Sequence, residues 1–409
     1  VSEYKGDFFW MPLKENEAKE KYNVPVYYKS YLKDKITLFN QLALNSSRHC
    51  DDFVFITDVH IEVNYLNSPA LIKNIIANTN AKKVFNGGDL MNGQKTREAG
   101  RETLQKWMDL MSFTYQYMTL GNHDTNSSWE QTKSGWLSYD ECYNIMYKPL
   151  ENVINTNGYI YYYLDNTSQK IRYYFLNAQW VEESTNHGTV LDYDKQLSWL
   201  EKTCAGISKD WSIIIMQHVF YTNYEQTKNE DGHYTTTKAL RSSLSDKLLN
   251  KLDSINSNEQ MPSIKMVLVG HTHWDWVEYF GDYPVIATSS DSSYNWEGPG
   301  NHAWTKKKNT TEEQCFDIFH LDLGKSIIKS IRIGQGSNRT SHIGCVSVKK
   351  GATISLTTSI NGDISWRSVY EDIATVNNGT VSGLIVGRTT IIADNNQGEQ
   401  EFWGINVTT

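Results

Sequence analysis

Five short polar motifs contain the residues whose types and spacing could support chemistry. In chain order they are Asp58-x-His60, Gly88-Asp89, Gly121-Asn122-His123-Asp124, a single His218, and Gly270-His271-Thr272-His273. Imidazole, carboxylate and amide groups together form a ligand set that suits borderline transition metals such as manganese, iron and zinc. None of the five cysteines lies in these motifs. The sequence therefore predicts a metal site without thiolate ligands.

The motifs supply enough ligands for two metal ions. The side chains divide into two sets of three, with Asp58, His60 and His273 for one ion and Asn122, His218 and His271 for the other. Asp89 is the expected bridge, because the two oxygens of one carboxylate can reach ions ~3.5–4 Å apart. Two such ions lower the pKa of a shared water and offset the charge of a phosphoryl transition state. His123 follows Asn122 and is not needed as a ligand, so we expect it to donate a proton to the leaving oxygen or to stabilise the phosphoryl oxygens.

Each motif also has a structural explanation when it is taken alone. Asp-x-His and Gly-Asp are common in turns, Asn122-His123-Asp124 could cap a loop, and a single histidine after a strand is often a hydrogen-bonded core residue. The five motifs favour a metal site because they occur together and each follows an expected strand.

The elements that must position these motifs alternate between strands and helices. Short runs rich in apolar residues predict strands at 53–56, 83–86, 115–120, 172–176, 212–216 and 265–269. The run at 53–56 is apolar at every position, which is typical of a strand that is buried on both faces. Amphipathic patterns predict helices at 102–111, 193–202 and 239–252, and one that opens at Ser68-Pro69. This alternation predicts an α/β fold, in which ligands bind at the carboxyl ends of the strands.

In this order, the five motifs resemble those of the calcineurin-like metallophosphoesterase superfamily, over roughly residues 53–290. The resemblance implies a four-layer α/β/β/α sandwich, a dinuclear centre, and hydrolysis of phosphomonoesters or phosphodiesters. One position departs from the family pattern. Where the family often has an Asp that orients the catalytic His, this chain has Asn92. An amide can accept a hydrogen bond from His123 but carries no charge, so we expect a weaker or differently tuned acid.

The composition changes after about residue 335. Residues 334–338 read as a linker, and turn signals then separate short strands at 353–356, 364–367, 375–376, 380–383, 389–393 and 401–407. This spacing predicts a small β-sandwich of ~65 residues. It resembles bacterial immunoglobulin-like group 2 domains over Trp366-Arg367-Ser368, Ile373-Ala374-Thr375-Val376, Gly379-Thr380-Val381-Ser382-Gly383 and Gly387-Arg388-Thr389-Thr390-Ile391. We therefore predict three parts: an N-terminal lead-in (1–50), a metallophosphoesterase domain (51–336) and an Ig-like domain (343–409).

Composition excludes several other classes of protein. The 39 basic and 47 acidic residues give a net charge of −8, which argues against a protein that coats nucleic acid. No run approaches the ~18 apolar residues of a membrane span. The cysteines are widely spaced and include no CxxC, so we expect neither a disulfide framework nor a zinc knuckle. The chain begins at Val1, and we expect that an N-terminal piece precedes it.

These features lead to one functional hypothesis and two alternatives. The first is hydrolysis, with two manganese, iron or zinc ions, of a phosphodiester in a bacterial envelope polymer such as a teichoic acid. The chain also resembles phosphoesterases of phages of Gram-positive bacteria, which implies an extracellular, cell-surface or virion-borne enzyme that contacts the envelope through its Ig-like domain. The alternatives are a phosphomonoesterase or nucleotidase, in which Trp274 and Trp276 could stack on the substrate, and an adhesion protein with a structural or vestigial metal site. Lys306-Lys307-Lys308 reads as a flexible charged turn.

Overall fold

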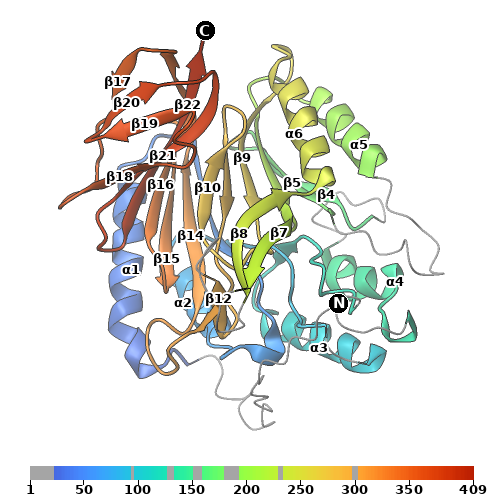
Figure 1. The fold of residues 1–409 in the computed structure, drawn as a ribbon. Coiled ribbons are helices and arrows are strands. Elements are labelled where there is room, and N and C mark those ends of the chain that lie inside the picture. Colours follow the sequence, from blue (N-terminus) through green and yellow to red (C-terminus); the bar gives the residue numbers. More distant parts are fainter. Residues whose placement is uncertain are drawn as a thin grey trace.

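The structure is a computed structural model that describes residues 23–93, 96–126, 133–150, 159–178, 193–228, 234–296 and 303–409 of the 409-residue chain. Two large β-sheets lie at the centre, and helices flank them (Figure 1). Within these ranges, no helix is both long enough and apolar enough to cross a lipid bilayer.

A nine-stranded sheet runs from the C-terminal region into the N-terminal half of the chain. Its strands, in spatial order, are β18 (Ser365–Ser368), β21 (Gly387–Asp394), β22 (Glu399–Thr408), β16 (Asn338–Lys349), β15 (Ile327–Gly334), β14 (Cys315–Asp322), β1 (Cys50–Ile56), β2 (Lys83–Asn86) and β3 (Gln116–Met118). Strands β1, β2 and β3 are parallel to one another. Their carboxyl ends therefore meet at one edge of the sheet.

The second large sheet has six strands. In spatial order they are β10 (Trp276–Tyr279), β11 (Pro284–Ala287), β9 (Ser263–Val269), β6 (Ser212–Gln217), β5 (Ile171–Leu176) and β4 (Tyr162–Asn166). Strands β11, β9, β6 and β5 are parallel. Smaller sheets contain β7 (Tyr221–Lys228) with β8 (Tyr234–Arg241), β12 (Tyr294–Trp296) with β13 (Ala303–Thr305), and β17 (Thr353–Ser355) with β20 (Thr380–Gly383) and β19 (Ala374–Asn377).

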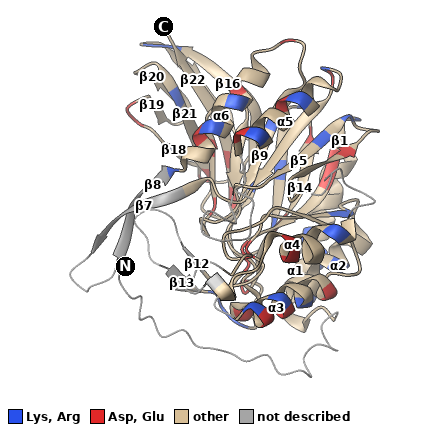
Figure 2. Cartoon of the chain, turned by 90° about the vertical axis from the view of Figure 1, so that its right-hand side faces the viewer, with Lys and Arg blue, Asp and Glu red and all other residues tan. Residues whose placement is uncertain are grey.

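Helices lie against the outer faces of both large sheets (Figure 1). They are α1 (Val26–Leu44), α2 (Ser68–Asn78), α3 (Arg97–Leu110), α4 (Tyr139–Cys142), α5 (Tyr193–Ala205) and α6 (Ser243–Asn256), with shorter 3₁₀ or π turns at Ile61–Val63, Lys133–Gly135, Tyr143–Tyr147 and Lys148–Leu150. Basic and acidic side chains alternate over α3, α5 and α6 (Figure 2). These helices therefore present no surface of a single charge.

Alternation of side chains along the strands creates the layers. In β6, Ile213 and Ile215 belong to the core that the sheet shares with α5 and α6. Ile214 and Met216 point the other way and belong to the core shared with the nine-stranded sheet. On the far side of that sheet, α1 buries one face at a spacing of three to four residues. The order of layers is helix, sheet, sheet, helix.

Helix α6 begins later in the structure than the sequence predicts. The leucine spacing predicts a helix at 239–252, but residues up to Arg241 belong to β8, where they pair with β7. The helix starts after Ser242, whose hydroxyl accepts a hydrogen bond from the backbone N–H of Ser245 at 3.0 Å. Residues 239–241 form a strand because they pair with β7. The spacing of apolar residues in the sequence gives no information about that pairing.

The segment after residue 346 contains the six expected strands and no helix. It has a small core of its own, which includes Val381, Ile391 and Ile405. Residues 334–338, expected as a linker, instead connect β15 to β16, and these two strands pair with each other. The nine-stranded sheet therefore continues across the boundary between the second and third predicted parts. The three-part division itself stays a prediction.

Candidate metal centre

All five motifs lie at the carboxyl ends of parallel strands. Strands β1, β2 and β3 of the nine-stranded sheet lead into Asp58, Asp89 and Asn122, and strands β6 and β9 of the six-stranded sheet lead into His218 and His271. Both sheets end at the same side of the molecule. Segments that are up to about half of the chain apart in sequence therefore meet in one place.

The first group of converging side chains is Asp58, His60, Asp89 and His273, all of them buried. One possible ligand atom from each lies within 4.8 Å of the others. The Nε2 atoms of His60 and His273 are 3.1 Å apart, and Nε2 of His273 is 3.2 Å from Oδ1 of Asp58. This is the set that the sequence assigns to one ion, together with Asp89.

The second group is Asp89, His218 and His271, under the same 4.8 Å criterion. Nε2 of His218 lies 3.1 Å from Oδ2 of Asp89 and 3.1 Å from Oδ1 of Asn122. Asp89 belongs to both groups, where the sequence places a bridging ligand. The structure thus brings all seven expected ligands together, and their roles as ligands stay a prediction.

The backbone at this site is strained. Five of the seven residues have left-handed φ angles, namely Asp58 (51°), His60 (42°), Asp89 (57°), His271 (70°) and His273 (60°). Such angles are uncommon for residues other than glycine, and each costs of order 1–3 kcal/mol unless the surroundings impose it. Strain concentrated on these residues indicates that side-chain placement, rather than backbone preference, determines the local conformation.

Two glycines are required by space rather than by backbone angle. A Cβ atom on Gly121 would lie 2.1 Å from Oδ1 of Asp89, and one on Gly270 would lie 2.2 Å from Oγ1 of Thr57. Their small size lets the turns after β3 and β9 approach the turns after β2 and β1. Close packing between the turns therefore requires glycine at both positions.

Burial and mutual attraction set the charge states of the site. Burial raises the pKa of Asp58, but the imidazoles of His273 and His218 outweigh this effect and hold it at about 2. Burial lowers the pKa of His60 and of His271 to about 3. These two imidazoles are therefore neutral near pH 7, and a metal ligand must be neutral imidazole or ionised carboxylate.

The residues present fit metal ions. Nδ1 of His218 is 2.6 Å from the carbonyl oxygen of Gly87, which can only accept, so this nitrogen carries the proton. In the neutral ring, Nε2 then directs a lone pair toward the oxygens of Asp89 and Asn122, a repulsive contact that either a proton on Nε2 or a metal ion bound by these atoms would relieve. Among the described residues, Oδ2 of Asp89 accepts no hydrogen bond although it is buried. Burial lowers the pKa of His218, but the Asp89 carboxylate raises it to about 9, and a metal ion would take the place of that proton.

His123 lies beside the first group, with Nε2 3.9 Å from Oδ2 of Asp89. Its Nδ1 is 2.5 Å from a backbone carbonyl oxygen, that of Asn92. The expected contact between these residues therefore exists, but it uses the main chain of Asn92 instead of the side-chain amide. The main-chain carbonyl fixes Nδ1 as the protonated nitrogen and turns Nε2 toward the site.

The supporting role of Asp124 was not predicted. The buried carboxylate of Asp124 accepts hydrogen bonds from the backbone N–H groups of Asp89, Leu90 and Gly121, and so holds two ligand turns together. Burial, followed by repulsion from Asp89, raises the pKa of Asp124 to about 7. The motif contains Asp124, but only the fold shows which N–H groups it accepts from.

The structure also tests two weaker sequence-based interpretations, those of Trp276 and Lys306. Nε1 of Trp276 donates to Oγ1 of Thr272 at 3.1 Å and its ring packs on Phe220 and Tyr221, so Trp276 covers the edge of the sheet. Lys306, expected in a flexible turn, is 2% exposed and donates to the carbonyl oxygen of Ser290. That interpretation of Lys306 is wrong, because this lysine is buried beneath the metal-site loops.

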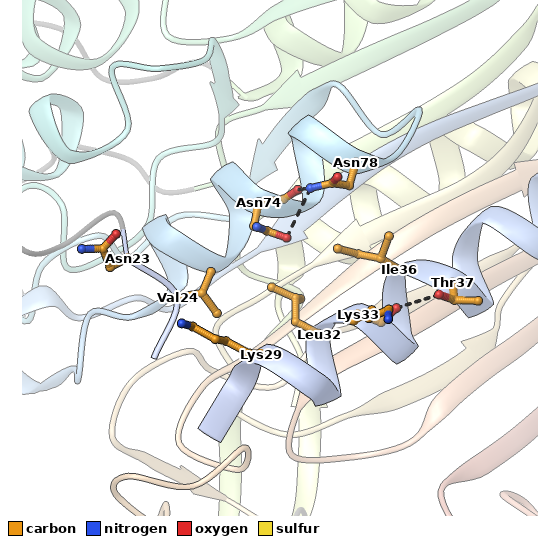
Figure 3. Close-up of a pocket in the computed structure, with 9 residues that line it drawn as sticks. All are labelled: Asn23, Val24, Lys29, Leu32, Lys33, Ile36, Thr37, Asn74 and Asn78. Atoms are coloured by element: carbon orange, nitrogen blue, oxygen red, sulfur yellow. Dashed lines mark hydrogen bonds between the residues drawn. The ribbon is translucent and has the colours of Figure 1, made fainter. Parts of the chain in front are cut away.

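A groove of about 520 Å³ lies elsewhere, between α1 and α2 (Figure 3). It is lined by Lys29, Lys33, Asn74 and Asn78, with Leu32 and Ile36 among its apolar residues. None of the seven expected ligands lines it. The chemistry of this chain therefore centres on the strand ends and not on this groove.

A comparison with known protein families agrees with this geometry. The sequence profile described as calcineurin-like phosphoesterase matches residues 52–275, more than half of the chain. No match to a curated protein is found. Similar solved structures include GAP50, the anchor in the inner membrane complex of Plasmodium (14% identity, 73% of this chain and 89% of that chain, TM-score 0.43). They also include the purple acid phosphatase PPD1 of yellow lupin (11%, 89% and 54%, 0.42) and the phosphopantetheinyl hydrolase of Mycobacterium tuberculosis (8%, 60% and 91%, 0.31). The chain therefore belongs to the calcineurin-like phosphoesterase family and is a metal-dependent phosphoesterase, for which the family and the geometry indicate a dinuclear metal site.

Proposed function

We propose that this chain hydrolyses a phosphodiester of a bacterial envelope polymer with two transition-metal ions. Asp58, His60 and His273 would hold one ion, Asn122, His218 and His271 would hold the other, and Asp89 would contribute to both. The observation that supports this assignment most strongly is the convergence of two ligand groups that share Asp89, on turns with five left-handed residues. Manganese, iron and zinc all suit this ligand set.

Metal ions bound by these residues would supply a nucleophile at neutral pH and would offset charge on the phosphoryl group. The chain contributes orientation and a proton. The contact of His123 Nδ1 with the Asn92 carbonyl leaves Nε2 as the atom that holds a proton for the leaving oxygen. Main-chain carbonyls fix two imidazoles, at His123 and His218, so both rings are oriented before substrate arrives.

The choice of a diester polymer rests on the C-terminal segment. Its strands form a small all-β region, and we propose that this region is an Ig-like module that holds the enzyme on the envelope. The same proposal places the protein outside the cell, at a cell surface or on a phage virion. Fractionation of producing cells, or of purified virions, with an antibody against the chain tests the location. Recovery only in the cytosol would contradict it.

A phosphomonoesterase or nucleotidase is the second candidate. The ring of Tyr294 lies 5.7 Å from the ring of His273, and Trp274 is half-buried beside it. Aromatic side chains at this position could contact a base or a sugar. The third candidate, an adhesion protein with a structural or vestigial metal site, predicts binding to the envelope without turnover.

Activity measurements on the full chain separate these candidates. The protein is stripped with a chelator and reloaded with manganese, iron or zinc, and is then assayed with an aryl phosphate, the matching bis-aryl diester, and purified teichoic acid. We expect activity to return with at least one metal and to be greater on the diester and the polymer. Preference for the monoester would favour the second candidate, and no turnover with any metal would favour the third.

A further inference from the structure

We propose that a largely buried network of Asp275, Asp317, Arg332 and Arg339 positions the metal ligand His273 and links it to the C-terminal strand β16. We call these four residues the charge network. The inference rests on the proposed role of His273 as a ligand. It assigns positioning residues to the site, and three of them, Asp317, Arg332 and Arg339, lie beyond the matched family region at 52–275.

The network contacts the turn that contains His273 through Asp275. Asp275 is two residues after His273, and its carboxylate accepts two hydrogen bonds from Arg332, at 2.8 Å from Nη1 and 2.6 Å from Nη2. Arg332 is fully buried and also donates to both oxygens of Asp317, at 3.0 Å and 3.1 Å. A planar guanidinium with two bidentate partners has very little freedom to move.

The same network holds the neighbouring segment on the other side of the turn. Oδ1 of Asp275 accepts from the backbone N–H of Ser289 at 3.0 Å, and the hydroxyl of Ser289 donates to the carbonyl oxygen of His273 at 2.9 Å. The main chain of His273 is thus tied to the network through one intervening serine. This geometry opposes the relaxation of a residue whose φ is 60°.

Arg339 brings in the C-terminal strand. It lies at the second position of β16, donates to Oδ2 of Asp317 at 2.7 Å, and donates to the carbonyl oxygen of Ala287 at 2.6 Å. Gly336, in the expected linker, packs directly on the network, because a Cβ there would lie 2.2 Å from Nη1 of Arg332. The connection to the C-terminal region is therefore part of the support of the metal site.

The charge and burial of the network suit a role in positioning His273. Two arginines and two aspartates balance in formal charge, and the side chains of Asp317, Arg332 and Arg339 are at most 3% exposed. Breaking such a group leaves an uncompensated buried charge. Residues that orient metal ligands typically change metal affinity by ~10–100-fold when they are mutated.

The chain offers a matched control. Arg172 and Asp165 form another bidentate pair, with both contacts at 2.7 Å, between β4 and β5 at the far edge of the six-stranded sheet. The exposed fraction of Asp165 (23%) is close to that of Asp275 (25%). Asp165→Asn therefore breaks a similar ion pair that does not contact the metal site.

The experiment compares wild type, Asp275→Asn and Asp165→Asn as full chains. Each is stripped of metal, and the number and affinity of bound zinc or manganese ions are measured by equilibrium dialysis with elemental analysis, beside the melting temperature of the metal-free protein. We expect Asp275→Asn to weaken one of two ions by ~10–100-fold and Asp165→Asn to bind both ions as wild type does, although both variants lose thermal stability. If Asp275→Asn fails to fold, Arg339→Lys replaces it. This variant keeps the positive charge but loses the planar guanidinium with its several N–H donors, and it should lower the affinity for the same ion.

Two results would overturn the inference. The first is wild-type affinity for both ions in Asp275→Asn, or in Arg339→Lys where that variant replaces it. The second is an equal loss of affinity in Asp165→Asn, which would mean that affinity follows general stability. Failure of the proposed function looks different, because the wild-type chain itself would then bind fewer than two ions.

Discussion

Replacement of Asp89 by Asn tests the bridging site most directly. Oδ1 of Asp89 accepts a hydrogen bond from the backbone N–H of His123 at 2.8 Å, and an amide oxygen can keep that contact. The amide nitrogen must then occupy the position of Oδ2, 3.1 Å from Nε2 of His218. Its hydrogens would point to the place where the cations belong, so the bridge to both ions is lost.

The size of the effect follows from the two ligand groups that share Asp89. Loss of a residue that only orients a ligand already costs ~10–100-fold in metal affinity, and Asp89 would be a direct ligand to two ions. We expect kcat/KM to fall by at least ~10³-fold, which corresponds to ~4 kcal/mol of transition-state stabilisation at 1.36 kcal/mol per factor of ten. The metal-free protein should lose ~1–3 kcal/mol of stability, because Asn is isosteric and tolerates a left-handed φ but gives up the charged contact with His218.

The assay measures hydrolysis of a bis-aryl phosphodiester, metal content by elemental analysis, and urea unfolding of the metal-free protein. Asp52→Asn is the control. Asp52 is also buried and pairs with His320 at 2.7 Å, away from the site, so this variant should lose ~1–3 kcal/mol of stability and keep its activity. Two bound metal ions and near-normal turnover in Asp89→Asn would refute the assignment of the bridge.

Three further changes have defined outcomes. His123→Ala should lower kcat by ~10²- to 10⁴-fold while metal content stays constant, and loss of metal would make His123 a ligand. Gly336→Ala should cost ~1–3 kcal/mol in urea unfolding, because its φ is 110° and its Cβ would lie 2.2 Å from Arg332; an unchanged midpoint would contradict the packing. Burial raises the pKa of Glu401, but the hydrogen bond from His342 and other donors lower it below the ordinary 4.5. The stability that Glu401 contributes is then present above that value and is lost as the pH falls through the lowered pKa. The difference in urea midpoint between wild type and Glu401→Gln should therefore shrink as the pH falls below about 4.5, and a constant difference would argue against this role.

Much of the site could be predicted because its residues follow local patterns. A run such as 53–56 is apolar at every position, and all four side chains are fully buried. The polar motif that follows such a strand lies at its carboxyl end in any α/β sheet. The seven expected ligands could therefore be placed at one edge from strand order alone.

The supporting residues followed no such pattern. Arg332 and Asp275 are 57 positions apart and their pairing depends on how β15 lies against the turn before β10. The contact of His123 with Asn92 uses a main-chain carbonyl, which every residue type possesses and which no side-chain motif can reveal. Residues 334–338 resemble a linker because they are rich in glycine, which is typical of flexible segments. In the structure, however, position 336 requires glycine because it packs directly against Arg332.

The sequence by itself determined the types of the chemical groups, the strands that carry them and the all-β character of the C-terminal region. These properties are set by residues close together in the chain, through apolar periodicity and turn preferences. Only the tertiary structure decided that the nine-stranded sheet continues into β16 and that Arg332 pairs with Asp275 beside the turn of His273. Such contacts join distant segments, and their energies depend on burial and geometry that exist only after the chain has folded.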